Sequence, residues 1–285
     1  MSLVEGKNCL ITGATSGIGR STALALSEMG ANIFFIARSQ QKAEELIEEV
    51  ERVSGKSPNA IIADLSSFKQ IERAAEEYKS LNKPIDVLLN NAGIMNTERR
   101  VTEDGLEEVF AVNHLAYFLL TNLLIKKILE SSLKRVVNVS SDAHRFLKSM
   151  NFDDLHSEKE FKMFTAYGQS KLANILFTKK LSTLYQDKGL TTNCLHPGFV
   201  STSIGTQNKN RPFLAHLIKW ISPLIGKTSD KGAETSIYLC SSEEVSNTSG
   251  EYFIDCKKAP ITKGAESKED AERLWKISLE LTGLN

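Results

Sequence analysis

The chain has 285 residues, of which 41% are hydrophobic and 25% charged, with 17 Gly and 6 Pro. This composition is typical of a soluble globular protein with one sizeable core, and no Pro/Gly/Ser-rich linker divides it, so we expect a single domain. The 35 Lys and Arg residues balance 35 Asp and Glu residues, which leaves no basic field to attract nucleic acid. We therefore expect no nucleic-acid partner.

Four cysteines are spread along the chain without the spacing of a zinc site or of a secreted disulfide framework. Together with five scattered histidines, they predict a reduced, cytoplasmic protein without a metal centre. The first ten residues contain no apolar signal core. The longest uninterrupted apolar run, 115–120, is far shorter than the ~20 residues that span a bilayer. We expect no transmembrane segment.

Short apolar runs alternate with longer stretches whose apolar residues recur every three or four positions, as in 43–50. Buried strands that alternate with helices indicate a parallel sheet covered on both faces. The predicted fold is α/β, a Rossmann-like, doubly wound parallel sheet of about seven strands in a single domain, 1–285. The predicted strands are Cys9–Thr12, Ile33–Ile36, Ala60–Ala63, Ile85–Leu89, Val136–Val139, Thr192–Leu195 and Tyr252–Ile254.

Two stretches interrupt the alternation and are candidate site-forming insertions: 142–165, which is polar with scattered Phe, and 205–227, which is amphipathic. The second carries Phe213, Leu217 and Trp220 at helical spacing. We interpret it as a lid over an apolar substrate, although a stripe of this kind also fits a helix packed for stability. The tail from Glu266 onward has an apolar helical face and is expected to pack on the body.

A turn rich in small residues follows the first predicted strand and precedes a predicted helix. Small residues let the backbone approach a ligand, and the helix N-terminus supplies free N–H groups and a positive dipole end that favour a pyrophosphate. Glycines also serve ordinary tight turns, but the strand before and the helix after this turn favour a nucleotide site. The candidate cofactor-binding residues in it are Gly13, Thr15, Ser16, Gly17, Ile18 and Gly19.

The residue after the second predicted strand indicates which dinucleotide binds. An Asp or Glu at this position would hold a ribose 2′-hydroxyl, but the sequence has Arg38. A guanidinium can direct two donors at a phosphate, so Arg38, with Arg20 and Ser39 as helpers, favours the 2′-phosphate of NADP(H). The alternative is a solvated surface arginine. We predict NADP(H) as the cofactor.

With several further motifs in the same order and spacing, the sequence resembles the short-chain dehydrogenase/reductase family from Lys7 to about Ile254. These motifs are Asp64-Leu65, Asn90-Asn91-Ala92-Gly93, Asn113, Ser141, Tyr167-x-x-x-Lys171 and Pro197-Gly198. Within the family it is similar to the retinol-dehydrogenase-like branch. That similarity rests on Asn113-His114-Leu115, Ser170-Lys171-Leu172-Ala173-Asn174, His196-Pro197-Gly198 and Tyr252-Phe253-x-Asp255-Cys256-Lys257.

The chemistry of the Tyr-x-x-x-Lys motif can be argued from its spacing. Tyr167 and Lys171 lie four apart on one helical face, so the ammonium is expected to lower the phenol pKa toward working pH. Tyr167 then serves as general acid/base, and Ser141 donates a hydrogen bond to the reacting oxygen. Ser140 competes for that role, since only one residue of the pair can point inward from a strand. The family's catalytic serine is the second of such a pair, which favours Ser141.

The resemblance implies further roles. Lys171 also holds the nicotinamide ribose, Asn113 takes part in a water-linked proton relay, and Asp64 meets the adenine amino group. Homo-oligomers are common among relatives and are compatible with this chain. The implied cofactor contacts outside the glycine turn and Arg38 are Asp64, Leu65, Asn91, Ala92, Gly93, Tyr167, Lys171, Pro197, Gly198 and Thr202.

The predicted function is that of an NADP(H)-dependent oxidoreductase that interconverts an alcohol and a carbonyl on a small lipophilic aldehyde or ketone. One alternative is a double-bond reductase of the protochlorophyllide type on the same scaffold. Another is a non-catalytic NADP-binding sensor, since a fold alone does not guarantee chemistry. An intact Ser141, Tyr167 and Lys171 favours the first interpretation.

Overall fold

The computed structural model describes residues 2–198 and 228–284. Its strands form one sheet in the order β3-β2-β1-β4-β5-β6-β7-β8, parallel except for the last pair. The predicted doubly wound α/β fold is confirmed. The strands are β1 Asn8–Thr12, β2 Asn32–Ala37, β3 Asn59–Ile62, β4 Val87–Asn90, β5 Arg135–Val139, β6 Thr191–His196, β7 Tyr252–Ile254 and β8 Lys257–Lys258.

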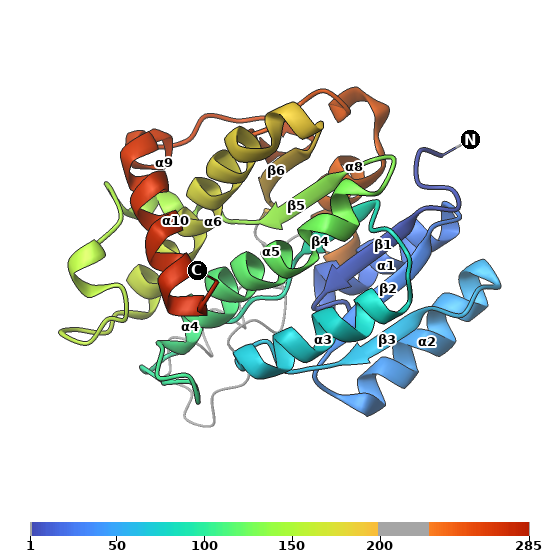
Figure 1. Cartoon of the computed structure of the whole chain (residues 1–285), viewed down its shortest axis with the longest axis horizontal. Helices are drawn as coiled ribbons and strands as arrows, with labels where there is room; N and C mark the ends of the chain where they lie inside the picture. Colours follow the sequence, from blue (N-terminus) through green and yellow to red (C-terminus); the bar gives the residue numbers. More distant parts are fainter. Residues whose placement is uncertain (1, 199–227, 285) are drawn as a thin grey trace.

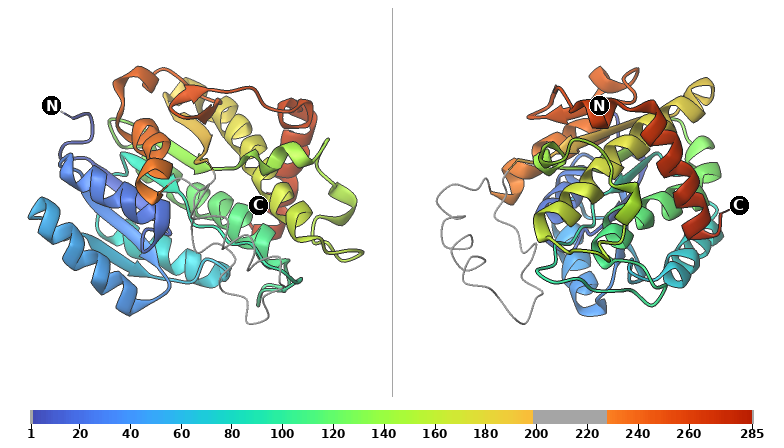
Figure 2. Two further views of the ribbon diagram at one scale, coloured as in Figure 1. Left: turned by 180° about the vertical axis from the view of Figure 1, so that it is seen from behind. Right: turned by 90° about the vertical axis from the view of Figure 1, so that its left-hand side faces the viewer.

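Helices cover both faces of the sheet (Figures 1 and 2). One face carries α1 Gly17–Glu28, α2 Gln40–Ser54 and α8 Ser229–Ser241. The other carries α3 Phe68–Ser80, α5 Ala116–Leu129 and α6 Met163–Tyr185, with α9 Lys263–Glu266 and α10 Lys268–Thr282 packed on α6. The short α4 Glu108–Phe110 and the π-helical turn η1 Ala111–Leu115 lead into α5.

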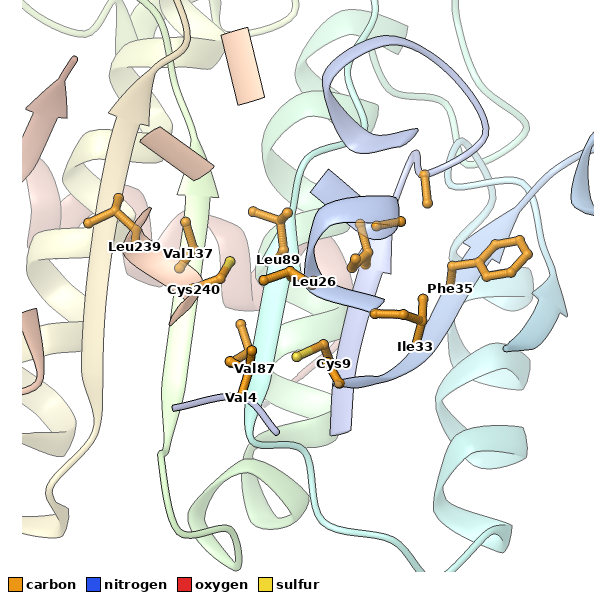
Figure 3. Packing of buried hydrophobic residues seen from close by; sticks show 14 of the residues in the cluster. Val4, Cys9, Leu26, Ile33, Phe35, Val87, Leu89, Val137, Leu239 and Cys240 are labelled. Atoms are coloured by element: carbon orange, nitrogen blue, oxygen red, sulfur yellow. The ribbon is translucent and has the colours of Figure 1, made fainter. Parts of the chain in front are cut away.

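Alternation along the strands divides the core into two layers. In β1, Cys9 and Ile11 belong to the cluster under α1, α2 and α8, whereas Leu10 belongs to the cluster under α3, α5 and α6. Figure 3 shows the first layer, in which Leu26 and Leu239 approach the strands from the helices. Burial on both faces explains why the strands are nearly unbroken apolar runs.

The C-terminal helix packs on the body, as the apolar face of the tail predicts. The Trp275 ring lies 4.8 Å from the Phe118 ring in α5, measured between centroids, and 6.0 Å from the Phe177 ring in α6. Leu274 is fully buried beside them. The end of the chain is therefore part of the core around α5 and α6.

The sheet has an eighth strand that the sequence analysis did not predict. β7 turns directly into β8, and the two turn residues, Asp255 and Cys256, have φ values of 49° and 60°. Two consecutive left-handed residues make the tight hairpin that joins antiparallel strands. Because β8 has only two residues and both are exposed lysines, it carries no apolar pattern to reveal it.

The first candidate insertion forms two 3₁₀ turns, η2 Asp142–Phe146 and η3 Phe152–Asp154, and its last residues already belong to α6. It is tied to α6, since the Asn151 backbone N–H donates to Gln169 Oε1 at 2.9 Å. A Cβ atom on Gly168 would lie 2.8 Å from the Ala143 carbonyl oxygen, so glycine permits this close approach. The second candidate insertion, 205–227, lies outside the described residues.

One described helix, the continuous segment Glu108–Leu129, is long and apolar enough to span a bilayer by length and composition alone. Of its most apolar window, 78% is buried inside the fold. Its apolarity is thus used in packing against the sheet and α6.

Candidate active site

The predicted site residues gather at the carboxyl edge of the sheet. Strand order reverses between β1 and β4, and ligands of open α/β sheets bind where the order reverses. Gly13 follows β1, Gly93 follows β4, Ser141 follows β5 and Pro197 follows β6, which are four adjacent strands. The topology therefore brings together segments that are far apart in the sequence.

The glycine turn after β1 lies tightly against the turn after β4. Gly13 has a φ of +67°, and a Cβ atom there would lie 2.8 Å from the Ala92 Cα atom. A Cβ atom on Gly19 would lie 2.3 Å from the Gly13 carbonyl oxygen and 2.4 Å from Asn91 Nδ2. Larger residues at either position would displace the turn, so its backbone remains bare toward a ligand.

Two polar side chains fix this arrangement from within. Thr12 Oγ1 accepts hydrogen bonds from the backbone N–H groups of Asn91, at 2.9 Å, and Ala92, at 3.0 Å. In return, Asn91 Nδ2 donates to the carbonyl oxygens of Thr12, at 2.9 Å, and Gly13, at 3.2 Å. The amide of Asn91, predicted as a cofactor contact, is thus used to join the two turns. The sequence analysis missed Thr12 because it looks like the last residue of a strand.

The start of α1 lacks the side-chain cap that begins four other long helices. At α2, α3, α8 and α10, a Ser or Thr side chain accepts a hydrogen bond from the first turn. The N-cap of α1, Ser16, makes no such bond, and no acidic residue lies in the first turn. The first N–H groups of α1 are left without a side-chain cap, which suits an anion such as a pyrophosphate.

Arg38 lies directly after β2 and is exposed. Among the described residues, its guanidinium makes no hydrogen bond or ion pair. The two predicted helpers are already engaged: Arg20 Nε donates to Glu49 Oε2 at 2.6 Å, and Ser39 Oγ caps α2. Arg38 is therefore the cation of this group that is available to a ligand.

The remaining predicted contacts differ in how accessible they are. Asp64 Oδ1 accepts from the backbone N–H and the hydroxyl of Ser66, both at 2.9 Å, which is a local turn, and Leu65 packs against the core. Pro197 and Gly198 are half-buried just beyond the end of β6. Thr202 lies outside the described residues.

Ser141, Tyr167 and Lys171 come together at the end of β5. The Lys171 Nζ atom lies 5.6 Å from the centroid of the Tyr167 ring and donates to the Val139 carbonyl oxygen at 3.0 Å. Ser141 interacts with the Tyr167 phenol through a hydrogen bond. Ser140 points the other way, since its hydroxyl donates to the Lys171 carbonyl oxygen at 2.7 Å. Strand alternation thus places Ser141 beside the phenol.

The Lys171 ammonium was expected to lower the pKa of Tyr167, but the surroundings in the fold raise it. Burial raises the pKa of Tyr167 to about 12, against a smaller lowering by Ser141. Burial also lowers the pKa of Lys171 to about 7, because its ammonium is withdrawn from water. The spacing brought the two groups together, but it carried no information on how strongly both are desolvated.

Asn113 lies in η1 and is fully buried beside Lys171. Its Oδ1 accepts from the Ile94 N–H at 2.8 Å, while its Nδ2 donates to the Ile94 carbonyl at 3.0 Å and to Ser170 Oγ at 3.0 Å. A Cβ atom on Gly93 would lie 3.5 Å from both Asn113 Oδ1 and Lys171 Nζ. A side chain at this position would contact both polar groups, and glycine leaves them uncovered on this side.

Tyr117 also lies beside Lys171. The sequence analysis did not single it out because it stands in an apolar run. Its hydroxyl donates to the Ala92 carbonyl at 2.6 Å, and its ring centroid lies 5.8 Å from Lys171 Nζ. The described residues hold no group of three or more metal-ligating side chains.

The pKa of Lys171 predicts a pH dependence of stability. Between about pH 7 and the ordinary lysine value near ~10.4, the unfolded chain holds a proton on Lys171 that the folded chain lacks. Unfolding then takes up a proton, so the free energy of unfolding rises with pH across this window, by up to ~1.4 kcal/mol per pH unit. We expect Lys171→Met to lose this rise. Urea unfolding of both proteins at several pH values measures the difference, and parallel pH profiles would contradict the assignment.

Comparison with known proteins agrees with this geometry. The family model for short chain dehydrogenases matches residues 7–212. The chain belongs to the short-chain dehydrogenase family. It is 40% identical to retinol dehydrogenase 12 of Mus musculus over 283 residues, and 40% identical to retinol dehydrogenase 14 of Homo sapiens over 296 residues. Each alignment covers 99% of this chain and 88% of the relative.

Solved structures share the fold of this short-chain dehydrogenase. An uncharacterized protein from Mycobacterium paratuberculosis has a TM-score of 0.76 at 29% identity, covering 98% of this chain and 94% of that one. A short chain dehydrogenase from Escherichia coli CFT073, solved in complex with NADPH, has a TM-score of 0.70 at 23% identity, covering 88% and 97%. The protein is an oxidoreductase of this family that acts on alcohol or carbonyl groups.

The residues present fit the nicotinamide dinucleotide that the family uses. The uncapped start of α1 and the bare glycine turn suit a pyrophosphate, and Gly93 opens toward Lys171 and Asn113. Such a cofactor would extend from the turn after β1 to the Tyr167 phenol.

Proposed function

We propose that the protein uses NADP(H) to interconvert a lipophilic alcohol and its aldehyde or ketone. The observation that carries the cofactor choice is Arg38, an exposed guanidinium at the end of β2 without a partner among the described residues. A ribose 2′-phosphate supplies the partner that a planar guanidinium prefers. The NADPH-bound relative from Escherichia coli supports the same choice.

The residues of the chain have distinct tasks in this reaction. When bound, the nicotinamide supplies or accepts the hydride. In reduction, Tyr167 donates its proton to the carbonyl oxygen as negative charge develops there, and its raised pKa keeps that proton in place at neutral pH. Ser141 hydrogen-bonds the same oxygen, and the Lys171 ammonium stabilises the phenolate that remains.

A lipophilic substrate is supported by the surroundings of these residues and by the relatives. Phe146 in η2 is 68% exposed and Phe164 in α6 is 45% exposed, and their rings pair edge to face at 6.5 Å. Phe164 lies one turn before Tyr167 on α6, so the apolar pair borders the phenol. The relatives named retinol dehydrogenases suggest a substrate of this polarity. No observation favours the double-bond reductase or the sensor.

We also propose a cytoplasmic location and a small-molecule substrate as the main partner, with a homo-oligomer as a compatible state. All four cysteines are free, and three are buried, as suits a reducing compartment. Fractionation of cells that express the full chain tests the location.

The proposal is tested by cofactor titration and a graded substrate series. Fluorescence titration should give a lower Kd for NADPH than for NADH. With NADPH saturating, medium-chain and aromatic aldehydes should have higher kcat/KM than short polar ones, because they bury more apolar surface. Equal affinity for both cofactors would contradict the NADP(H) assignment, and best turnover of short polar carbonyls would contradict the lipophilic substrate.

A further inference from the structure

A line of buried polar side chains connects the C-terminal helix α10 to the Lys171 ammonium. We propose that Ser278 and His114, acting through Asn174, are positioning residues that hold Lys171 in place. The inference rests on the proposed function, because it takes Lys171 as part of the reacting site. The C-terminal helix α10, which packs on α6 (Figure 1), then has a part in the reaction.

The first link joins α10 to the π-helical turn η1. His114 Nε2 lies 3.0 Å from Ser278 Oγ, and both residues are fully buried. The rings around the imidazole are those of Phe110, Phe118 and Phe177, at 5.1 to 6.3 Å between centroids. Burial in this apolar setting lowers the pKa of His114 to about 3, so the ring is neutral. One ring nitrogen therefore donates and the other accepts.

The second link fixes which nitrogen carries the proton. Asn174 Nδ2 donates to the Val139 carbonyl oxygen at 3.2 Å, which leaves Asn174 Oδ1 as an acceptor. Asn174 Oδ1 and His114 Nδ1 are both buried, and neither makes a hydrogen bond of standard geometry among the described residues, while the two side chains are close enough to interact. Because an amide oxygen can only accept, we assign the proton to Nδ1. Nε2 then accepts the Ser278 hydroxyl proton.

The third link reaches the reacting site. The carbonyl oxygen of Val139 accepts from Asn174 Nδ2 at 3.2 Å and from Lys171 Nζ at 3.0 Å. The orientation of Asn174, set by His114, therefore fixes the acceptor that holds the ammonium. The neighbour of His114, Asn113, bonds Ser170 at 3.0 Å. One π-helical turn thus supports Lys171 from two directions, as π-bulges often do at functional sites.

Loss of the Ser278 hydroxyl should affect His114 first, then Asn174, and through it Lys171. Without its donor, the imidazole is free to move its proton to Nε2, and Asn174 Oδ1 then faces a bare ring nitrogen in place of an N–H group. The Val139 carbonyl then holds the ammonium less firmly, so Lys171 gives up its proton at lower pH. Since reduction needs the ammonium, we expect Ser278→Ala to lower kcat by about 5- to 10-fold, the effect of about one lost hydrogen bond. The alkaline limb of its pH–rate profile should move to lower pH.

Thr282→Ala is the matched control. Thr282 lies one turn further along α10 and is buried, but its hydroxyl donates to the Ser278 backbone carbonyl at 2.6 Å and not to His114. Both variants should lose similar thermal stability, whereas only Ser278→Ala should alter kcat and the pH profile. Ser278→Thr should restore both. Equal kinetic effects in Ser278→Ala and Thr282→Ala would overturn the proposal.

Nitrogen-15 NMR of histidine-labelled full-length protein tests the network without catalysis. The expected result is a neutral His114 ring protonated at Nδ1 in the wild type and in Thr282→Ala, and an altered tautomer in Ser278→Ala. A wild-type ring protonated at Nε2 would overturn the proposal. A protein that has the expected tautomer but reduces no carbonyl would refute the proposed function and leave the network intact.

Discussion

Tyr167→Phe is expected to lower kcat for carbonyl reduction by a factor of order 10² or more while cofactor affinity stays within a few fold. The substitution removes the proton that, in the proposed mechanism, is transferred to the reacting oxygen, and burial keeps the phenol protonated at neutral pH. The ring remains and keeps its place beside Lys171. Steady-state kinetics and NADPH titration measure the two effects separately.

Tyr78→Phe is the control for the loss of a buried phenol hydroxyl. Tyr78 is fully buried in α3, and its hydroxyl donates to the Pro84 carbonyl at 3.1 Å, away from the carboxyl edge of the sheet. This variant should lose about 1 kcal/mol of stability and keep its turnover. A Tyr167→Phe enzyme with wild-type turnover would mean that another group delivers the proton.

Arg38→Asp is expected to reverse the proposed preference for NADPH over NADH. The change removes a charge-assisted partner of the 2′-phosphate, which weakens NADPH binding by about 10- to 100-fold. It also adds a carboxylate where an acid can accept from the ribose 2′-hydroxyl, so NADH should bind more tightly. Fluorescence titrations with both cofactors measure the ratio of the two Kd values.

The matched control for Arg38→Asp is Lys188→Asp. Lys188 is exposed, carries the same charge and lies just before β6, at the opposite edge of the sheet. It should leave the ratio unchanged, because its charge is far from the carboxyl edge and screened by salt. If both variants shifted the ratio equally, the effect would be one of net charge, and Arg38 would not bind the phosphate.

The fold was predictable because local pattern and global topology agree. Most parallel strands are largely apolar and buried, and the predicted bounds differ from the observed ones by at most two residues, as for Ile85–Leu89 against Val87–Asn90. β8 escaped because its pairing depends on two left-handed turn residues, Asp255 and Cys256, instead of on a pattern. The tail helix was predictable from its apolar face.

The grouping of Ser141, Tyr167 and Lys171 was predictable, but the electrostatics of the group were not. The four-residue spacing of Tyr167 and Lys171 placed them together, and strand alternation allowed only one of Ser140 and Ser141 to face the phenol. The spacing could not give the raised pKa of Tyr167, because desolvation depends on the whole surrounding fold.

The supporting contacts were invisible in the sequence for a different reason. Asn91 bonds backbone groups 78 and 79 positions away, and His114 bonds a serine 164 positions away. Such bonds exist only after the strands and helices have packed. The motifs Asn90-Asn91-Ala92-Gly93 and Asn113-His114-Leu115 contained Asn91 and His114 but gave no indication of their partners.

The most direct test of the account follows the hydride itself. Wild-type protein is incubated with NADPH deuterated at the transferred position and an aromatic or medium-chain α,β-unsaturated aldehyde, and the product is analysed by mass spectrometry and NMR. The account predicts an alcohol with deuterium on the former carbonyl carbon and the double bond intact. Deuterium on a former double-bond carbon with the aldehyde retained, or tight NADPH binding with no deuterium transfer to any carbonyl compound, would contradict it.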